Sequence, residues 1–126
     1  MKTVAFYGSC EARSSLVLVS SRISRPYDVH EIHAKFPAGS NNLLKLRLYE
    51  SPDDQAPTSG APSGVSMLAD YGQVDYVVGD DDFKWVRHHV VIDTGGSYLK
   101  VYAVNDDFYE HDVDVQILIG EDVAEG

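Results

Sequence analysis

Apolar side chains recur at every second position in three segments of this sequence, and this period constrains the fold more than any other feature. In the first segment they are Ile32, Ala34 and Phe36, and the same alternation runs through residues 44–48 and 113–119. Successive side chains of a β-strand point to opposite faces, so each segment has one apolar face and one polar face. The three segments therefore predict half-buried strands.

Further runs rich in valine and tyrosine predict additional strands, because β-branched and aromatic side chains suit a pleated sheet. These runs are residues 4–7, 16–19, 75–78, 83–92 and 98–104. No window of about a dozen residues carries the apolar stripe of a helix. The strongest helical candidate is one short turn within residues 65–71.

Together these elements predict an all-β fold, a single antiparallel β-sandwich of about eight strands that spans residues 1–126. A jelly roll is the first choice of topology, and an immunoglobulin-like sandwich is the alternative. Turn-forming residues in 93–97 predict a tight hairpin that joins the runs 83–92 and 98–104. The stretch 98–107 and the run 113–119 look like the final hairpin of the sandwich.

The acidic balance of the sequence limits the partners that we expect. Its 126 residues carry a formal charge of -10, which disfavours a nucleic-acid backbone or an anionic membrane as partner. The apolar runs 4–7 and 16–19 are too short for a signal peptide or a membrane span. Cys10 is the single cysteine, which excludes an intrachain disulfide. We expect a protein made without a secretory signal, with no nucleic-acid or membrane partner.

A proline-rich segment interrupts the strand pattern at residues 51–64. It contains Pro52, Pro57 and Pro62 and has almost no apolar side chain larger than alanine. Proline removes hydrogen-bond donors from a sheet, so we expect a long exposed loop. This loop is either a tolerated surface insertion or a segment that lies against a neighbouring subunit. The last residues, 120–126, predict an acidic tail.

Enzyme motifs are missing from the sequence. It has no Gly-x-Ser-x-Gly elbow and no glycine-rich phosphate loop, and no catalytic signature surrounds Cys10. His30 and His33 have opposite parity, as do His88 and His89, so neither pair can chelate zinc from one regular strand. We expect no catalytic residues and no enzymatic activity, with an enzyme of unrecognised type as the remaining possibility.

Acidic turns are the best candidates for a metal site. The candidate ligands are Asp80, Asp82, Asp106 and Asp107, which fall at two of the expected strand junctions. Calcium takes several oxygen ligands and suits loops of this kind, but the sequence has no 12-residue calcium-binding loop. The alternative is that these acids are solvated turns, in which case the protein has no cofactor.

Aromatic residues in the expected strands are candidates for a binding surface. Tyr49, Tyr102 and Trp85 lie within or beside strands, with acidic and amide residues near them. Flat aromatic faces with polar neighbours suit sugar rings, but tyrosine and tryptophan are also enriched in sheets and in protein interfaces. The run around Trp85 is apolar on both parities, which favours a core or interface position for this side chain.

Four features of this sequence occur together in one known class of protein: the short all-β length, the loop 51–64, the missing cysteine pair and the stretch 98–107. In these features the sequence resembles small jelly-roll proteins that decorate or complete phage particles. The resemblance implies a non-enzymatic structural protein of the virion, made in the host cytoplasm. It implies capsid or other virion proteins as partners, together with a homo-oligomer, for which we expect a trimer. The expected interface residues are Pro52, Pro57, Pro62, Tyr49, Tyr102 and Trp85. The alternative function is a carbohydrate-binding module that uses surface tyrosines and acidic loops, with or without calcium.

Overall fold

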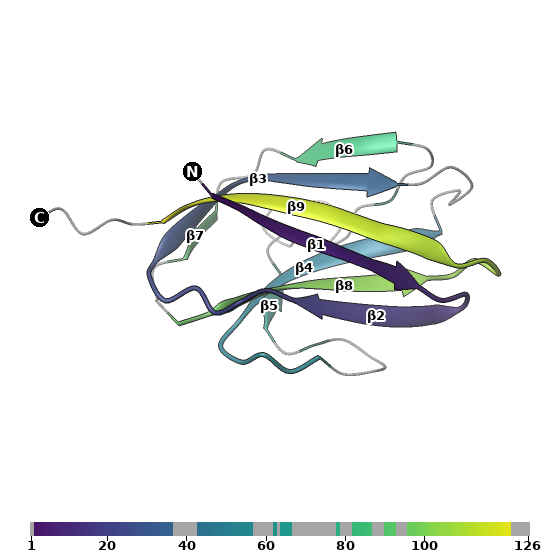
Figure 1. Cartoon of the computed structure of the whole chain (residues 1–126), viewed down its shortest axis with the longest axis horizontal. Coiled ribbons are helices and arrows are strands. Elements are labelled where there is room, and N and C mark those ends of the chain that lie inside the picture. Colours follow the sequence, from purple (N-terminus) through teal and green to yellow (C-terminus); the bar gives the residue numbers. More distant parts are fainter. Residues whose placement is uncertain are drawn as a thin grey trace, which may run out of the picture.

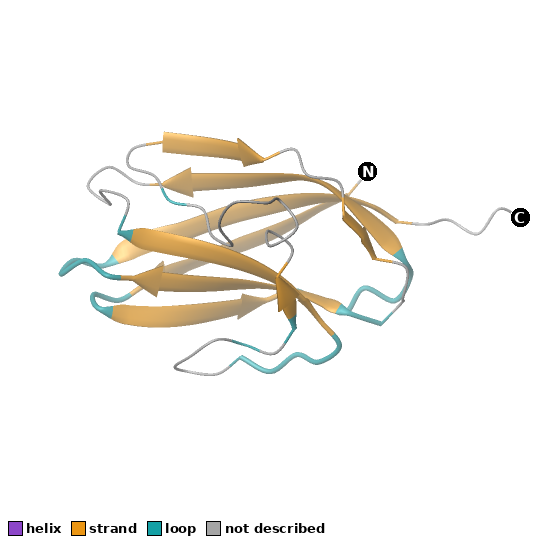
Figure 2. Ribbon diagram, turned by 180° about the vertical axis from the view of Figure 1, so that it is seen from behind, coloured by secondary structure: helices purple, strands orange, loops and turns teal. Residues whose placement is uncertain are grey.

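Two antiparallel sheets make up the protein in the computed structural model, which describes residues 2–36, 43–56, 62, 64–66, 78, 82–86, 90–92 and 96–121. The first sheet has the order β1-β9-β3-β6, with β7 also paired to β3, and the second has the order β2-β8-β4-β5. Figure 1 shows the two sheets as separate layers, and Figure 2 shows the described residues as strands and loops. The strands are β1 Lys2–Cys10, β2 Ser14–Val19, β3 Tyr27–Phe36, β4 Leu44–Ser51, β5 Val65–Ser66, β6 Asp82–Val86, β7 Val90–Ile92, β8 Tyr98–Asn105 and β9 His111–Glu121.

The predicted all-β class and antiparallel pairing are confirmed, but the strand count differs from the expected eight. Six strands have six or more residues, and β5, β6 and β7 have two to five. The expected strand 83–92 is divided between β6 and β7, which both pair with β3. The expected strand 75–78 lies outside the described residues except for Val78. Within the described part of the chain, no helix is long and apolar enough to cross a membrane.

The predicted helical turn at 65–71 is wrong at its start. Val65 and Ser66 form β5 and pair with Glu50 and Tyr49, and residues 67–71 lie outside the described residues. A β-branched residue such as valine suits the edge of a sheet, and the pairing with β4 outweighs a weak local preference for a turn.

The two predicted hairpins are also wrong. β7 pairs with β3 of the first sheet, whereas β8 pairs with β2 and β4 of the second. β8 and β9 likewise belong to different sheets. The chain therefore passes from one sheet to the other between β7 and β8 and again between β8 and β9, a difference that turn composition does not encode. Of the expected hairpin residues 93–97, residues 93–95 lie outside the described residues.

The core lies between the sheets and follows the predicted alternation. Leu44, Leu46 and Leu48 of β4 are buried, as are the apolar residues at alternate positions of β9, Val113, Val115, Ile117 and Ile119. Full burial of each such side chain contributes about 1.5–3 kcal/mol. The central position of β9, between β1 and β3, gives it a partner on both edges.

An irregularity in β3 changes which of its residues share a face. The register with β9 shifts between Val29 and Glu31, which leaves His30 as an extra residue. Val29 and Ile32 are both buried, so His30 and His33 lie on the same outer face. The premise that their parity separates them is therefore wrong, because β3 is not a regular strand.

Candidate binding site

Two of the expected interface residues meet on the outer face of the second sheet. Tyr49 lies opposite Lys100, and Tyr102 lies between Val17 of β2 and Arg47 of β4. The ring centroids of Tyr49 and Tyr102 are 6.4 Å apart with an interplanar angle of 47°, and both side chains are half-buried. The tilted pair gives this face an aromatic centre, and the role of both residues in an interface stays a prediction.

The beginning of the proline-rich segment is joined to the same sheet through Asp53. Lys100 points to the outer face of β8 and is nevertheless fully buried, and its Nζ lies 2.9 Å from Oδ1 of Asp53. The turn that carries Asp53 is closed by two hydrogen bonds. The backbone N–H of Asp53 donates to Oγ of Ser51, 3.3 Å away, and Oδ1 of Asp53 accepts a 2.9 Å bond from the backbone N–H of Gln55. The beginning of this segment is therefore fastened to its own chain.

The expected exposed loop is thus only partly exposed. Pro52 is exposed, but Pro62 is buried within the chain itself, contrary to the expectation for residues 51–64. Pro57 lies outside the described residues. Trp85 lies in β6 of the first sheet, opposite His33 in the pairing with β3, and its side chain is outside the described part. The structure therefore does not place Trp85 in the same sheet as Tyr49 and Tyr102.

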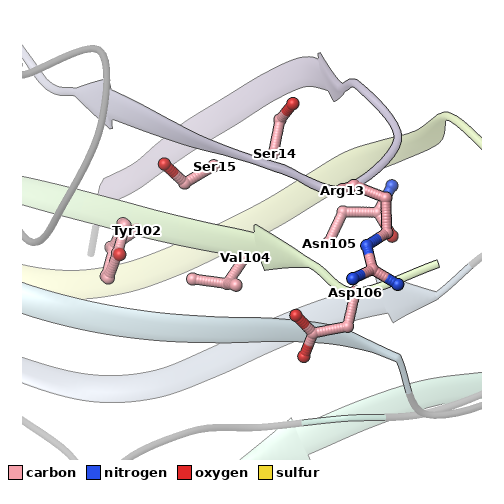
Figure 3. Close-up of a pocket in the computed structure, with 7 residues that line it drawn as sticks. All are labelled: Arg13, Ser14, Ser15, Tyr102, Val104, Asn105 and Asp106. Atoms are coloured by element: carbon pink, nitrogen blue, oxygen red, sulfur yellow. The ribbon is translucent and has the colours of Figure 1, made fainter. Parts of the chain in front are cut away.

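We call the outer face of the second sheet, which carries Tyr49 and Tyr102, the tyrosine-bearing face. A shallow pocket of about 480 Å³ opens at one end of it. Figure 3 shows Tyr102 at one end of this pocket and Arg13 and Asp106 at the other, with Val104 between them. Its lining residues come from β2, β8 and the turns beside them, and they are Arg13, Ser14, Ser15, Tyr102, Val104, Asn105 and Asp106. The lining therefore combines an aromatic ring, aliphatic carbon, hydroxyls and both signs of charge.

A buried amide fixes the end of the sheet that carries the pocket. Nδ2 of Asn105 lies 3.2 Å from the carbonyl oxygens of Cys10 and Glu11 and 2.7 Å from that of Tyr109. Its Oδ1 accepts a 3.0 Å bond from the backbone N–H of Asp107. One side chain thus joins the turn between β1 and β2 to the loop between β8 and β9.

That anchored loop presents two large aromatic side chains to solvent. Phe108 is 76% exposed and Tyr109 is 72% exposed. The Arg13 guanidinium carbon lies 5.1 Å from the centroid of the Phe108 ring, within the range of a cation–π contact. The backbone N–H of Arg13, which has a positive φ of 55°, donates a 3.0 Å bond to the carbonyl of Asp107. We call Phe108 and Tyr109 the aromatic tip.

The two acids beside the aromatic tip have different partners. Asp107 is buried, its Oδ2 lies 2.8 Å from Nε2 of His111, and its Oδ1 accepts a 2.7 Å bond from the backbone N–H of Phe108. Asp106 is exposed and lies 3.5 Å from Nζ of Lys45. These two expected calcium ligands are therefore not directed to one point.

The other two expected calcium ligands add no described side chain to this site. Asp80 lies outside the described residues, and Asp82 begins β6 with its side chain undescribed. Among the residues that the structure describes, no three histidine, cysteine or acidic side chains are grouped so that they would hold a metal ion.

Acidification is expected to weaken the fold through Asp107. The hydrogen bond from His111, helped by the one from the Phe108 N–H, holds the pKa of the Asp107 carboxyl below its ordinary value of 3.8, although burial opposes this shift. A lowered folded-state pKa adds stability above the ordinary value, and that stability is lost as pH falls through the folded-state pKa. Urea unfolding midpoints measured from neutral pH down to about pH 2.5 should fall more for the native protein than for Asp107→Asn. Equal declines would contradict this assignment.

The comparisons with known proteins give no family for this chain. No protein-family model matches the sequence, and no curated protein matches it. Among solved structures, it is similar to the crystal structure of the Yersinia pseudotuberculosis-derived mitogen, with a TM-score of 0.46 and 8% sequence identity over 99% of this chain and 92% of that chain. A likeness of this degree carries no argument about function.

Proposed function

We propose that this protein is a non-enzymatic structural protein that works by assembly, and that the aromatic tip is its main docking element. The observation that carries the proposal is the exposure of Phe108 and Tyr109 on a loop whose backbone is held by Asn105 and Asp107. Aromatic side chains dominate the binding energy of protein interfaces. A loop that is already ordered loses little conformational entropy on binding, which favours docking.

We propose a jelly-roll topology for the two sheets, and the strand pairing supports it. β1 pairs with β9, β2 with β8, β3 with β6 and β7, and β4 with β5, all antiparallel. The first four strands thus pair with the remaining strands in reverse order, as in one long hairpin that is rolled into two layers. Double-sheet jelly rolls are common in viral capsid and lectin domains.

We infer a virion or similar particle as the setting, with capsid or other virion proteins as partners and a trimer of this chain as the assembling unit. The support is analogy of topology and the closed cyclic symmetry typical of such assemblies. The tyrosine-bearing face of the second sheet supplies further contact area beside the aromatic tip, because Tyr49 and Tyr102 keep part of their surface accessible. The net charge of -10 favours protein partners over nucleic acid.

The oligomeric mass tests the proposed docking element. Light scattering over a range of protein concentrations is expected to show a trimer for the native chain and a monomer for Phe108→Ser/Tyr109→Ser. Tyr7→Ser is the matched control, because Tyr7 is 71% exposed but lies on β1 of the first sheet. A native protein that stays monomeric at high concentration and does not cosediment with capsids would overturn the proposal.

A further inference from the structure

The pocket beside the aromatic tip has a floor that β8 supplies at alternate positions. Tyr102 and Val104 lie on the outer face of β8, and Asp106 follows at the next position of the same parity, just beyond the strand. Ser15 of β2 lies opposite Val104 in the strand register. These side chains line one pocket, and Figure 3 shows the aromatic ring and the charged groups at its opposite ends. A ligand about as long as two sugar rings therefore meets an apolar surface and polar groups together, because four strand positions span about 13 Å.

The polar groups of the pocket include both hydrogen-bond acceptors and donors. The Asp106 side chain is 49% exposed, so its carboxylate stays accessible beside Lys45. The guanidinium of Arg13 is directed over the Phe108 ring at the rim and provides N–H donors there. Ser15 adds a hydroxyl that can donate or accept. A ligand with adjacent hydroxyl groups satisfies a carboxylate and a guanidinium together.

The charge of the site selects against ionic ligands. Arg13 and Lys45 oppose Asp106, so the pocket has no single dominant sign, and the chain as a whole carries -10. A phosphate or carboxylate ligand would approach Asp106 and an acidic protein, and a cationic ligand would approach Arg13 and Lys45. A neutral polyol has neither conflict, and its C–H face packs against Tyr102 and Val104.

The pocket is also ordered in advance of any ligand. The buried Asn105 side chain ties the turn before Arg13 to the loop after Asp106, through the carbonyls of Glu11 and Tyr109. A rigid frame of this kind loses little entropy on binding.

From these observations we propose that the pocket lined by Tyr102, Ser15, Asp106 and Arg13 binds a short neutral oligosaccharide. One sugar ring packs on Tyr102, and hydroxyls of the next sugar residue donate to the Asp106 carboxylate and accept from the Arg13 guanidinium. The site adjoins the aromatic tip through Arg13, which lies over the Phe108 ring, and it shares Tyr102 with the tyrosine-bearing face, but Asp106 belongs to the sugar site alone.

Saturation-transfer NMR with individual neutral methyl glycosides tests the proposed site. The probes are the methyl glycosides of maltose, lactose, cellobiose and chitobiose, which are two rings long, and at least one is expected to receive signal from the protein. Tyr102→Ala removes the stacking surface and Asp106→Ala removes the acceptor, so each is expected to weaken binding of that probe by about tenfold or more. Asp106 is exposed, so the second variant keeps the fold even if the first does not.

The control and the contrary outcomes are distinct from those of the assembly proposal. Tyr7→Ala removes an exposed tyrosine from the other sheet and is expected to leave probe binding unchanged. Asp106→Ala is expected to leave the oligomeric mass unchanged. No signal for any of the four probes, or equal binding by native protein and Asp106→Ala, would overturn the sugar site and would leave the aromatic-tip proposal standing.

Discussion

Replacing Asn105 by leucine is expected to lower the free energy of unfolding by about 3 kcal/mol, because an unsatisfied buried polar group costs about 1–3 kcal/mol. Asn105 is 1% exposed, and its amide satisfies the carbonyls of Cys10, Glu11 and Tyr109 and the N–H of Asp107. Leucine occupies a similar volume but satisfies none of these four groups. The expected loss stays near 3 kcal/mol, although four polar groups lose a partner, because water can reach some of these groups in the loop.

Urea unfolding at neutral pH measures this effect, with Asp106→Asn as the matched control. Asp106 is the next residue along the chain but is exposed, and its carboxylate lies 3.5 Å from Nζ of Lys45, so its substitution is expected to change stability by less than about 0.5 kcal/mol. A loss below about 1 kcal/mol for Asn105→Leu would show that the network is not a structural anchor.

The half-buried strands could be predicted well from the sequence because one face of each strand packs in the core and the other faces water. At residues 44–48 of β4 and 111–119 of β9 every second residue is buried and its neighbours are not, so the residue types themselves carry the period of two. In β3 the alternation holds on both sides of His30, but the bulge there changes its phase. A bulge leaves no fixed signature in composition, so the shared face of His30 and His33 became visible only in the structure.

Strand partners were predicted less well than strands. The turn residues after β7 and β8 show where the chain bends, but they do not say whether the next strand stays in the same sheet. That choice depends on contacts across the two layers, as when Leu44 and Val115 bury their side chains in the same core. Both predicted hairpins failed for this reason.

The candidate site also contains some residues that the sequence predicted and others that only the structure revealed. Tyr49 and Tyr102 were expected from residue type and parity, and the structure brings their rings together. Asn105 and Lys100 were missed as buried groups, because their polarity predicts exposure and only tertiary contacts cover them. Phe108 and Tyr109 were not predicted, although two large aromatic residues directly after an acidic turn are a signal for an exposed aromatic loop.

The second large effect is expected at the buried pair of Lys100 and Asp53. Asp53→Ala takes the carboxylate away from an ammonium that is fully buried, which costs about 3–5 kcal/mol when both partners are inaccessible. Here the Asp53 side chain is 41% exposed, so water reaches the vacated position and the expected loss is about 1–3 kcal/mol. The detached segment after Ser51 is expected to become more accessible to protease at the same time.

A second substitution distinguishes a buried charge from lost packing. Lys100→Met keeps most of the volume of the lysine but carries no charge, so Asp53→Ala/Lys100→Met is expected to be more stable than Asp53→Ala alone by about 1 kcal/mol. The exposed pair Lys45 and Asp106 is the matched control, and Asp106→Ala should cost less than about 0.5 kcal/mol. If Asp53→Ala cost no more than Asp106→Ala, the ammonium of Lys100 would be solvated and the proline-rich segment would not be held to the sheet by this pair. If instead the double variant recovers stability, the desolvated charge of Lys100 is what makes Asp53 necessary, and electrostatics holds the beginning of the proline-rich segment to the second sheet.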